Sequence, residues 1–271
     1  MPAGTDSAKG VAVMKDMDRL MLFLEKTEPF AVAYSGGLDS SLLLWAAASV
    51  RPGTPAITYV SPIHPVWEKD NACAYASALK TPHITVTSDI LAVEGLRDNL
   101  PGRCYYCRRA LYRCIKKAAE EQGLHTVIEG SNADDYAKNT PGTRAARECG
   151  IISPLAECGF TKEDVRRLAN IAGIPARNRA TYACLATRLP AGERLSPDKL
   201  HIIEQAELLL HKNGYDNIRV RMQGYCARIE LEKNELLRFI LDPHLDELHA
   251  ALLAMGFDHV SVDIGGYSKS L

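Results

Sequence analysis

The run AVAYSGGLDSS joins an apolar segment to two glycines and then to a second apolar segment, SSLLLWAAA. This order predicts a strand, a tight turn and a helix N-terminus. Gly36 and Gly37 let the backbone turn sharply and approach a ligand closely. Free N–H groups at the helix start, with the hydroxyls of Ser35 and Ser40, form an anion-binding site. Asp39 suits such a site only if a cation bridges it, which predicts a magnesium-chelated phosphate.

The pattern SGGxDS directly after an apolar strand resembles the PP-loop of the ATP pyrophosphatase superfamily. Enzymes of that superfamily cleave ATP between its α- and β-phosphates, so the resemblance implies that this chain binds ATP. A Walker loop is a poor match, because the chain has no GxxxxGK[ST] pattern and no lysine follows the glycines. The alternative is a turn with a purely structural role.

Three cysteines form a second candidate site. Cys104 and Cys107 are separated by two residues and follow the turn signal PGR, so we expect them in a loop; Cys184 lies in TYACLATRLP. Two thiols at this spacing can chelate one ion or cluster, and a distant third can complete three-point ligation. Three ligands leave one iron of a four-iron cluster open to an external ligand. A structural zinc site, a redox dithiol and unrelated buried thiols remain alternatives.

Acidic and basic side chains add two further groups. The run EGSNADD contains Asp134 and Asp135, which can hold magnesium or, alternatively, cap a helix. Arg188, Arg219 and Arg221 are candidates for an anionic substrate group, because guanidinium binds phosphate and carboxylate with two hydrogen bonds. Arg219 and Arg221 alternate along one strand and so share a face. The alternative is that these arginines form salt bridges to Glu207 or Glu230.

These residues must be positioned by strands and helices that alternate along the chain. Strands are predicted at residues 30–34, 56–60, 83–87 and 125–128, and helices at 40–50, 67–79, 90–97 and 108–122. This alternation predicts an α/β fold, with a parallel sheet and helices on both faces. The strands end in polar residues, among them Ser35, Ser61 and the segment that contains Gly130. Since ligands bind at the carboxyl ends of such strands, we expect these residues to line one crevice.

The regular alternation of strand and helix ends beyond Pro190. A helix is predicted to start at SPDK and to run to residue 212, and residues 218–222 and 227–231 alternate like paired strands. Further helices at 236–255 and a strand at 259–264 complete a small α+β unit. We therefore expect a first domain at residues 1–192 and a second domain for substrate binding or oligomerisation at 193–271.

Composition limits the classes of function. The chain has 271 residues, 46% hydrophobic and 24% charged, as is ordinary for a globular protein of one or two domains. A net charge of −1 argues against an extended nucleic-acid surface. No apolar run of membrane-spanning length occurs, and the polar start MPAGTDSAKG lacks a signal pattern, so we expect a cytoplasmic protein. Eight cysteines in such a protein favour metal, redox or catalytic roles over disulfides.

Several motifs, taken in order, resemble one family. The series AVAYSGGLDSS, RCYYCRRALY, EGSNADDY, SPL, ACLATR, VRV and ARIEL is similar to LarE, over nearly the whole chain. That family comprises ATP-dependent sulfur transferases that make the nickel-pincer nucleotide cofactor of lactate racemase. The resemblance implies a PP-loop ATP pyrophosphatase domain of the adenine nucleotide α-hydrolase type, a small C-terminal domain, and homo-oligomers, often hexamers. The implied substrate is a small molecule, pyridinium-3,5-biscarboxylic acid mononucleotide, whose carboxylates become thiocarboxylates.

The family has two branches that differ in the sulfur donor. In one branch a single cysteine at the ACLATR position gives up its own sulfur; in the other, three cysteines hold a [4Fe–4S] cluster that carries a sulfide to be donated. The presence of Cys104, Cys107 and Cys184 resembles the cluster branch. The resemblance also places the glycine-turn residues on the phosphates of ATP with Mg²⁺, and the arginines, with Glu207 nearby, around the substrate phosphate.

Rival classes share part of this pattern. Ammonia-using PP-loop ligases have SGGxDS but need no cysteine trio. PP-loop tRNA thiolases can carry three cysteines, but the net charge of −1 does not favour RNA binding. A nucleotide-binding protein with structural zinc, which is not an enzyme, would release no pyrophosphate from ATP.

Overall fold

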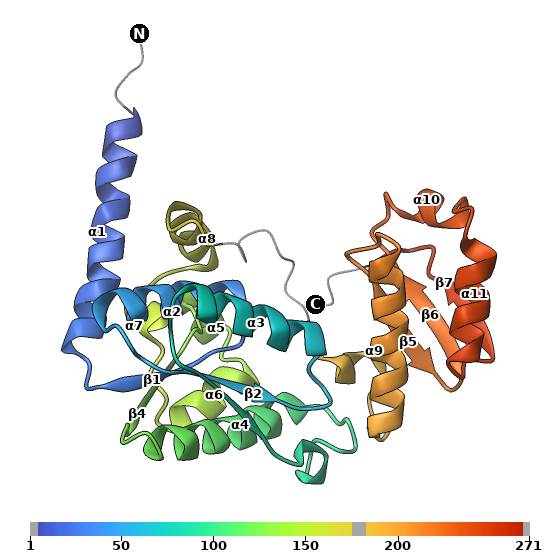
Figure 1. Cartoon of the computed structure of the whole chain (residues 1–271), viewed down its shortest axis with the longest axis horizontal. Coiled ribbons are helices and arrows are strands. Elements are labelled where there is room, and N and C mark those ends of the chain that lie inside the picture. The colour runs from blue at the N-terminus through green and yellow to red at the C-terminus, as the bar shows by residue number, and fades with distance from the viewer. Residues whose placement is uncertain (1–4, 175–182, 268–271) are drawn as a thin grey trace. The chain divides into compact units, whose positions relative to one another are not determined.

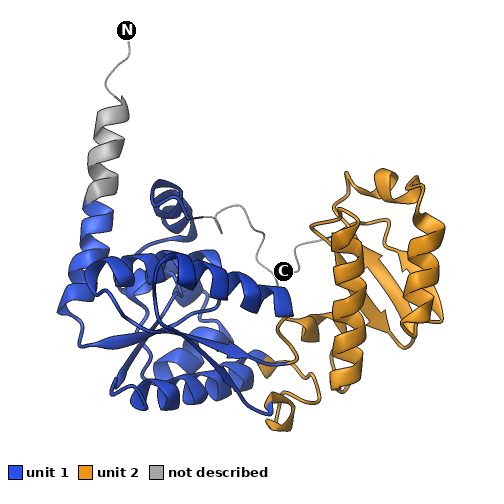
Figure 2. Ribbon diagram, viewed as in Figure 1, with its two compact units in different colours: residues 1–61, 66–89, 104–181 blue, residues 62–65, 90–103, 182–271 orange. Residues whose placement is uncertain are grey.

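The computed structural model describes the backbone of residues 5–174 and 183–267, and the side chains from residue 15 onward within those ranges. It divides into two compact units, shown in Figure 2. Unit 1 comprises residues 1–61, 66–89 and 104–181, and unit 2 comprises residues 62–65, 90–103 and 182–271. The predicted domain limits, 1–192 and 193–271, stay a prediction.

Unit 1 contains a four-stranded parallel sheet (Figure 1). Its strands are β1 (Phe30–Ala33), β2 (Ala56–Val60), β3 (His83–Thr87) and β4 (Thr126–Glu129), in the order β3-β2-β1-β4. Strand β1 is central, and it pairs in parallel with β2 and with β4. All four predicted strands are present, and the predicted fold class is confirmed.

Helices cover both faces of this sheet. They are α1 (Thr5–Lys26), α2 (Leu38–Val50), α3 (Val66–Ala78), α4 (Arg103–Glu120), α5 (Ala133–Ala137), α6 (Pro141–Glu148), α7 (Pro154–Glu157) and α8 (Lys162–Ile171). In Figure 1, α2 and α3 lie on one face and α4 and α6 on the other. This two-sided cover explains why β1 is buried along its whole length.

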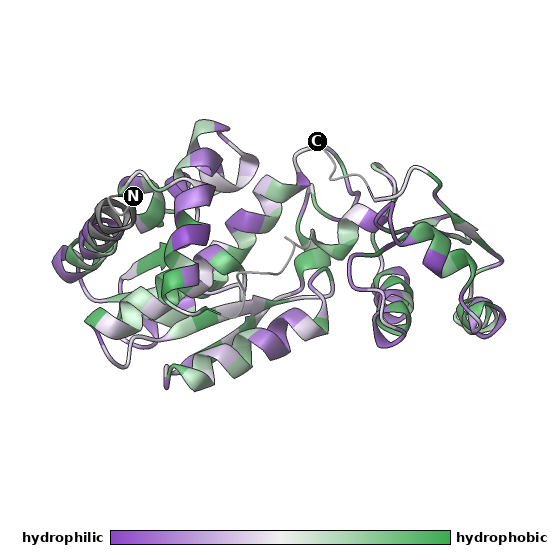
Figure 3. Ribbon diagram, turned by 90° about the horizontal axis from the view of Figure 1, so that it is seen from above, coloured by the Kyte–Doolittle hydropathy of each residue, from purple (hydrophilic) through white to green (hydrophobic). Residues whose placement is uncertain are grey.

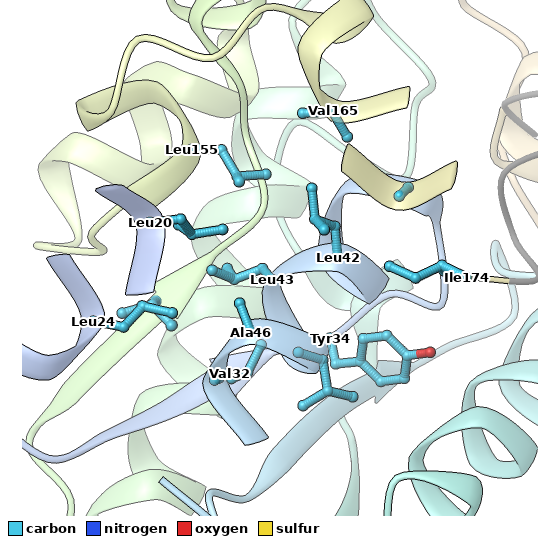
Figure 4. Packing of buried hydrophobic residues seen from close by; sticks show 14 of the residues in the cluster. Leu20, Leu24, Val32, Tyr34, Leu42, Leu43, Ala46, Leu155, Val165 and Ile174 are labelled. Carbon is cyan, nitrogen blue, oxygen red and sulfur yellow. The ribbon is translucent and has the colours of Figure 1, made fainter. Parts of the chain in front are cut away.

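The hydrophobic core of unit 1 is packed around α2. Leu42 and Leu43 are fully buried there, and Figure 4 shows them among side chains of α1, β1, α7 and α8. Burying one such leucine side chain contributes about 1.5–3 kcal/mol. The start of α2, where the glycine turn lies, is therefore anchored to a rigid core.

Two local predictions were wrong. A helix was expected at residues 90–97, but the structure has only a short 3₁₀ helix, η1 (Ile90–Ala92). Gly95, with a φ of +82°, leaves the helical region soon after it. The loop expected around Cys104 and Cys107 is also absent, because α4 begins at Arg103 and contains both cysteines.

Unit 2 holds the small α+β fold that the sequence predicts. Its elements beyond η1 are η3 (Leu185–Arg188), α9 (Pro197–Lys212), β5 (Arg219–Gln223), β6 (Cys226–Glu230), α10 (Leu236–Ile240), α11 (Leu245–Ala254) and β7 (His259–Val262). Ser196 caps α9 by accepting a hydrogen bond from the Lys199 N–H at 3.3 Å, with Pro197 in the first helical position. Strands β5 and β6 pair antiparallel as predicted, and β7 joins β6 in parallel.

The helices of both units mix hydrophobic and hydrophilic residues, as Figure 3 shows by colour. Such helices bury their hydrophobic face and expose their hydrophilic face. Within the described ranges, none is long and apolar enough to cross a lipid bilayer.

Candidate functional site

The glycine turn of unit 1 has the form that the sequence predicts. Ser35 Oγ and Ser40 Oγ lie 3.0 Å apart, and the Ser35 N–H donates to Ser40 Oγ at 3.3 Å. Ser40 Oγ in turn donates to the Gly37 carbonyl oxygen at 3.1 Å. Gly37 is the N-cap of α2 and supplies no side-chain hydrogen bond. The first N–H groups of α2 therefore have no side-chain cap and are suited to bind an anion.

Glycine is required at two positions for steric reasons. Gly36 has a φ of +76°, and a Cβ there would lie 3.2 Å from Ala72 Cβ on α3. Gly130 follows β4, and a Cβ there would lie 2.8 Å from the Ser40 N atom. Strand β4 can thus approach the start of α2 only because residue 130 lacks a side chain. This contact brings the predicted site residue Gly130 to the glycine turn.

Asp39, in the first turn of α2, has two partners. Its Oδ2 atom forms an ion pair with the Lys162 ammonium, and its Oδ1 atom accepts a hydrogen bond from Asn132 Nδ2 at 3.3 Å. The exposed fractions of the Lys162 and Asp39 side chains are 26% and 22%. The Asp39 carboxylate beside the glycine turn therefore pairs with a lysine that the sequence analysis missed, and the magnesium-chelated phosphate stays a prediction.

Asp134 and Asp135 lie in the first turn of α5, next to this pair. Asp135 forms a capping box with Asn132, whose side-chain oxygen accepts from the N–H groups of residues 134 and 135. Asp134 Oδ2 accepts from the Lys162 backbone N–H at 2.9 Å. The helix-capping alternative thus describes Asp135. Among the described residues, no group of three or more His, Cys, Asp or Glu side chains is arranged to hold a metal ion. The magnesium ligands Asp39, Asp134 and Asp135 stay predictions.

The carboxyl ends of β4 and β2 are also polar and buried. Glu129 ends β4 and accepts hydrogen bonds from Ser131 Oγ at 2.9 Å and from Ser153 Oγ. Tyr136 OH lies 2.8 Å from Ser153 Oγ, and burial raises the pKa of this tyrosine. Ser61 follows β2 and is buried. Glu129 is thus fixed by hydroxyl groups that the sequence pattern did not single out.

The three cysteines are divided between the two units. Cys104 is exposed and Cys107 half-buried, both in the first turns of α4, where a spacing of three residues puts them on one face of the helix. Cys184, in unit 2, is half-buried and directly precedes η3. None of the three is in a disulfide bond. The positive end of the α4 dipole suits anionic thiolate ligands, and the cluster itself stays a prediction.

The arginines of unit 2 surround buried carboxylates. Arg188 binds Glu207 with two hydrogen bonds, Nε to Oε1 at 2.8 Å and Nη2 to Oε2 at 3.2 Å. Glu207 Oε1 also accepts from the Val220 N–H at 2.9 Å. Both side chains are almost fully buried. The salt-bridge alternative is therefore correct for Arg188.

Burial and charge act in opposite directions on the pKa of Glu207 but in the same direction on the pKa of Arg188. Desolvation raises the pKa of the Glu207 carboxyl, while the Val220 N–H, Arg219 and Arg221 oppose that rise. Burial and the neighbouring Arg219 lower the pKa of Arg188 to about 9, so that Arg188 stays protonated at neutral pH. The pair is an internal ion pair surrounded by further positive charge.

Arg221 and Arg219 have different partners. Arg221 Nε lies 2.5 Å from Glu230 Oε1, and its Nη1 donates to the Thr187 carbonyl oxygen at 2.6 Å. Arg219 donates to the Ile218 carbonyl oxygen, and its guanidinium lies 4.8 Å from the centroid of the Tyr267 ring. Arg228 Nη2 also lies 2.9 Å from Glu230 Oε1, and its Nε lies 3.7 Å from Asp263. Four guanidinium groups thus gather around three carboxylates, those of residues 207, 230 and 263. The excess positive charge can attract an anionic ligand.

Comparisons with known proteins found relatives along nearly the whole chain. The family model described as asparagine synthase matches residues 22–193. A protein of Synechocystis that is described as uncharacterized is 34% identical over 254 residues, which is 93% of this chain and 95% of that protein. The pyridinium-3,5-bisthiocarboxylic acid mononucleotide synthase of Lactiplantibacillus plantarum is 31% identical over 265 residues, or 97% of this chain and 92% of the synthase. A tRNA(Ile)-lysidine synthase of Bradyrhizobium is 27% identical, over 68% of this chain but 50% of its own length.

Proposed function

Because the chain belongs to the LarE family of PP-loop enzymes, we propose that it converts the carboxylates of pyridinium-3,5-biscarboxylic acid mononucleotide into thiocarboxylates, with ATP as the activating substrate. The chain is an ATP-dependent sulfurtransferase. The observation that supports the specific substrate is the similarity to the Lactiplantibacillus plantarum synthase along nearly the whole of both chains.

The glycine turn of unit 1 would bind the phosphates of ATP. A carboxylate is a poor electrophile, since its leaving group would be oxide. Attack of a carboxylate oxygen on the α-phosphorus forms an acyl adenylate and releases pyrophosphate. The N–H groups of α2, with Ser35 and Ser40, lie where they can stabilise the negative charge of the departing pyrophosphate. Mg²⁺, when bound at Asp39, would neutralise further charge.

Transfer of sulfur would follow on the activated carbonyl. A sulfur nucleophile attacks that carbon, the bond to the adenylate oxygen breaks, and AMP leaves with the electron pair. We propose that a [4Fe–4S] cluster held by Cys104, Cys107 and Cys184 supplies the sulfide. Thiolates are the ligands that such clusters use, and none of the three cysteines is in a disulfide bond.

The arginine group of unit 2 would bind the phosphate of the mononucleotide. Arg219 is a candidate for direct contact, because a guanidinium group can bind a phosphate with two hydrogen bonds. Arg188 and Arg221, which pair with glutamates, would position it and add positive charge.

The sulfur source can be tested by purifying the protein without oxygen. We expect iron and acid-labile sulfide, and the loss of both in Cys104→Ala, Cys107→Ala and Cys184→Ala. Cys73→Ala is the matched control, because Cys73 is an exposed cysteine on α3 and should retain both.

The alternative donor is the sulfur of Cys184 itself. In that case Cys104→Ala would keep one turnover, and mass spectrometry would show the loss of H₂S from Cys184 afterwards. That result, with no iron in the unmodified protein, would contradict the cluster proposal and leave the ATP-dependent step intact.

A further inference from the structure

A basic groove runs along α4 beside the end of α6, and these two helices cover the same face of the sheet (Figure 1). Its volume is about 480 Å³, and α4 contributes four cations to its lining: Arg109, Arg113, Lys116 and Lys117. Three or four residues make about one helical turn, so these positions share one side of α4. The groove is therefore lined by a stripe of positive charge.

Two of the four cations have partners within the protein. Lys116 Nζ donates a hydrogen bond to the carbonyl oxygen of Cys149 at 3.0 Å. Because Cys149 is the C-cap of α6, this contact stabilises the end of that helix. The guanidinium of Arg109 lies 5.3 Å from the centroid of the Tyr105 ring. These contacts give Lys116 and Arg109 a role in the fold.

Arg113 and Lys117 have no such role. Both are exposed, and among the residues whose side chains the structure describes neither forms a hydrogen bond or an ion pair. With Arg109 they form a series at spacings of four residues, and like charges at this spacing repel each other and weaken a helix. A solvated helix face usually mixes both signs of charge. Helix stability therefore does not explain the stripe, whereas an anionic partner does.

The other groups of the groove limit the kind of anion. Glu120 and Glu148 also line it, and a long polyanion such as RNA would be repelled by these carboxylates. The C-terminus of α6 lies there as well, at Cys149. A helix C-terminus carries partial negative charge and has no free N–H groups, so it is a poor site for phosphate. A short segment with carboxylate side chains fits the groove better.

We propose that the basic groove docks an acidic segment of a partner protein, whose carboxylates pair with Arg109, Arg113 and Lys117. Residues four apart on a helix are separated by about 6 Å along its axis. Alternate residues of an extended chain are separated by about 6.6 Å and point to the same side. Acidic residues at every second position of an extended segment would therefore meet the three cations in turn. This inference does not depend on the proposed function.

The test is fluorescence anisotropy with two labelled seven-residue peptides of the same composition. One peptide has glutamate at its second, fourth and sixth positions and serine elsewhere, and the other has three consecutive glutamates in its centre. An ionic strength of about 0.1 M screens distant charges. We expect the alternating peptide to bind with a dissociation constant below about 1 mM. The block peptide should bind about threefold more weakly, because its carboxylates point to both sides of the chain.

The double variant Arg113→Gln, Lys117→Gln should bind the alternating peptide at least about fivefold more weakly, because two exposed charge pairs are lost. The matched control is Lys69→Gln, Arg166→Gln, which removes the same charge from two exposed residues of α3 and α8. Its affinity should stay within about twofold of the unmodified protein. The groove variant should melt at the same temperature as the unmodified protein or higher, since repulsion along α4 is relieved.

The inference is wrong if the two double variants bind the alternating peptide equally, or if that peptide does not bind to the unmodified protein. It is also wrong if inorganic tripolyphosphate or a short single-stranded RNA occupies the groove more tightly than the peptide does. Light scattering tests the remaining occupant: if the groove variant has a different oligomeric state from the control, a second copy of this chain covers the groove, and the docking of a partner protein is contradicted.

Discussion

The Glu207 carboxylate receives the Arg188 guanidinium and the Val220 N–H inside unit 2. Glu207→Ala should destabilise the protein by about 3–5 kcal/mol, because it leaves the buried Arg188 charge uncompensated. The measurement is the free energy of unfolding in urea. Glu235→Ala serves as a control, since the Glu235–Arg238 pair is exposed and should contribute no more than about 1 kcal/mol. Equal decreases in the free energy of unfolding of the two variants would contradict the internal ion pair.

His83 on β3 makes the stability of unit 1 depend on pH. Burial and the nearby Lys69 lower its pKa from the ordinary 6.5, and its Nε2 lies 2.7 Å from Thr58 Oγ1. The unfolded chain therefore binds a proton at a higher pH than the folded protein does. Stability due to His83 is present above pH 6.5 and is lost as the pH falls from there toward the folded pKa.

We expect the melting temperature to decrease below pH 6.5, and His83→Gln to remove part of this decrease. Melting curves of both proteins between pH 5 and 8 provide the measurement. His244→Gln, on the exposed start of α11, is the control. If the melting temperature of His83→Gln decreases with falling pH as much as that of the unmodified protein, other groups cause the decrease.

Among the secondary-structure elements, β4 and the start of α2 depend on each other through Gly130. A Cβ at that position would overlap the Ser40 N atom, at 2.8 Å, which is backbone and cannot turn aside. Gly130→Ala should lower the free energy of unfolding by about 1–3 kcal/mol through overpacking. A shift of the glycine turn by an ångström should lower ATP-dependent pyrophosphate release about a hundredfold.

The control is Gly142→Ala in α6, where the added Cβ would meet only ordinary contacts at 3.7 Å. Pyrophosphate release should be unchanged in this variant. If Gly130→Ala also releases pyrophosphate at the normal rate, the close approach of β4 is not needed for the site.

The sequence predicts elements well where the signal is local. The glycine pair at residues 36 and 37 follows a short apolar run, and this pattern is enough to place the turn and the start of α2. The start of α4 was predicted too late, because a CxxC spacing occurs in loops and helices alike. The 3₁₀ helix η1 was predicted too long, since apolar periodicity continues past Gly95.

Contacts between distant residues gave no such signal. The Lys162–Asp39 pair joins positions 123 residues apart, and only the start of α8 at Thr161 could be predicted, from its capping pattern. The partners of Arg188 and Arg221 were foreseen only as alternatives, because strand register and helix packing decide which carboxylate each arginine meets.

At the scale of the whole molecule, the two units hold different parts of the proposed chemistry. The glycine turn belongs to unit 1 and the arginine group to unit 2. We expect Arg219→Gln to raise the KM for the mononucleotide about tenfold or more, through the loss of a charge-assisted contact. The dissociation constant for ATP should stay within about twofold, because the proposed contact of Arg219 is with the mononucleotide and not with ATP.

Steady-state kinetics and calorimetry give these two constants. The KM for the mononucleotide should rise less in Arg219→Lys than in Arg219→Gln. A parallel loss of ATP affinity in both variants would show that unit 2 takes part in binding the nucleotide.

The central place of β1 also determines when the strands around the glycine turn are completed during synthesis. Residue 30 of β1 pairs with residue 126 of β4, so one edge of β1 stays open until the ribosome has made and released the later strand. At roughly 5–20 residues per second, that wait is on the order of 5–20 seconds. Through that interval the nascent chain exposes a strand edge that another chain could join. Synthesis rate and chaperone supply should therefore affect the yield of folded protein more than changes in the late unit 2 strands do.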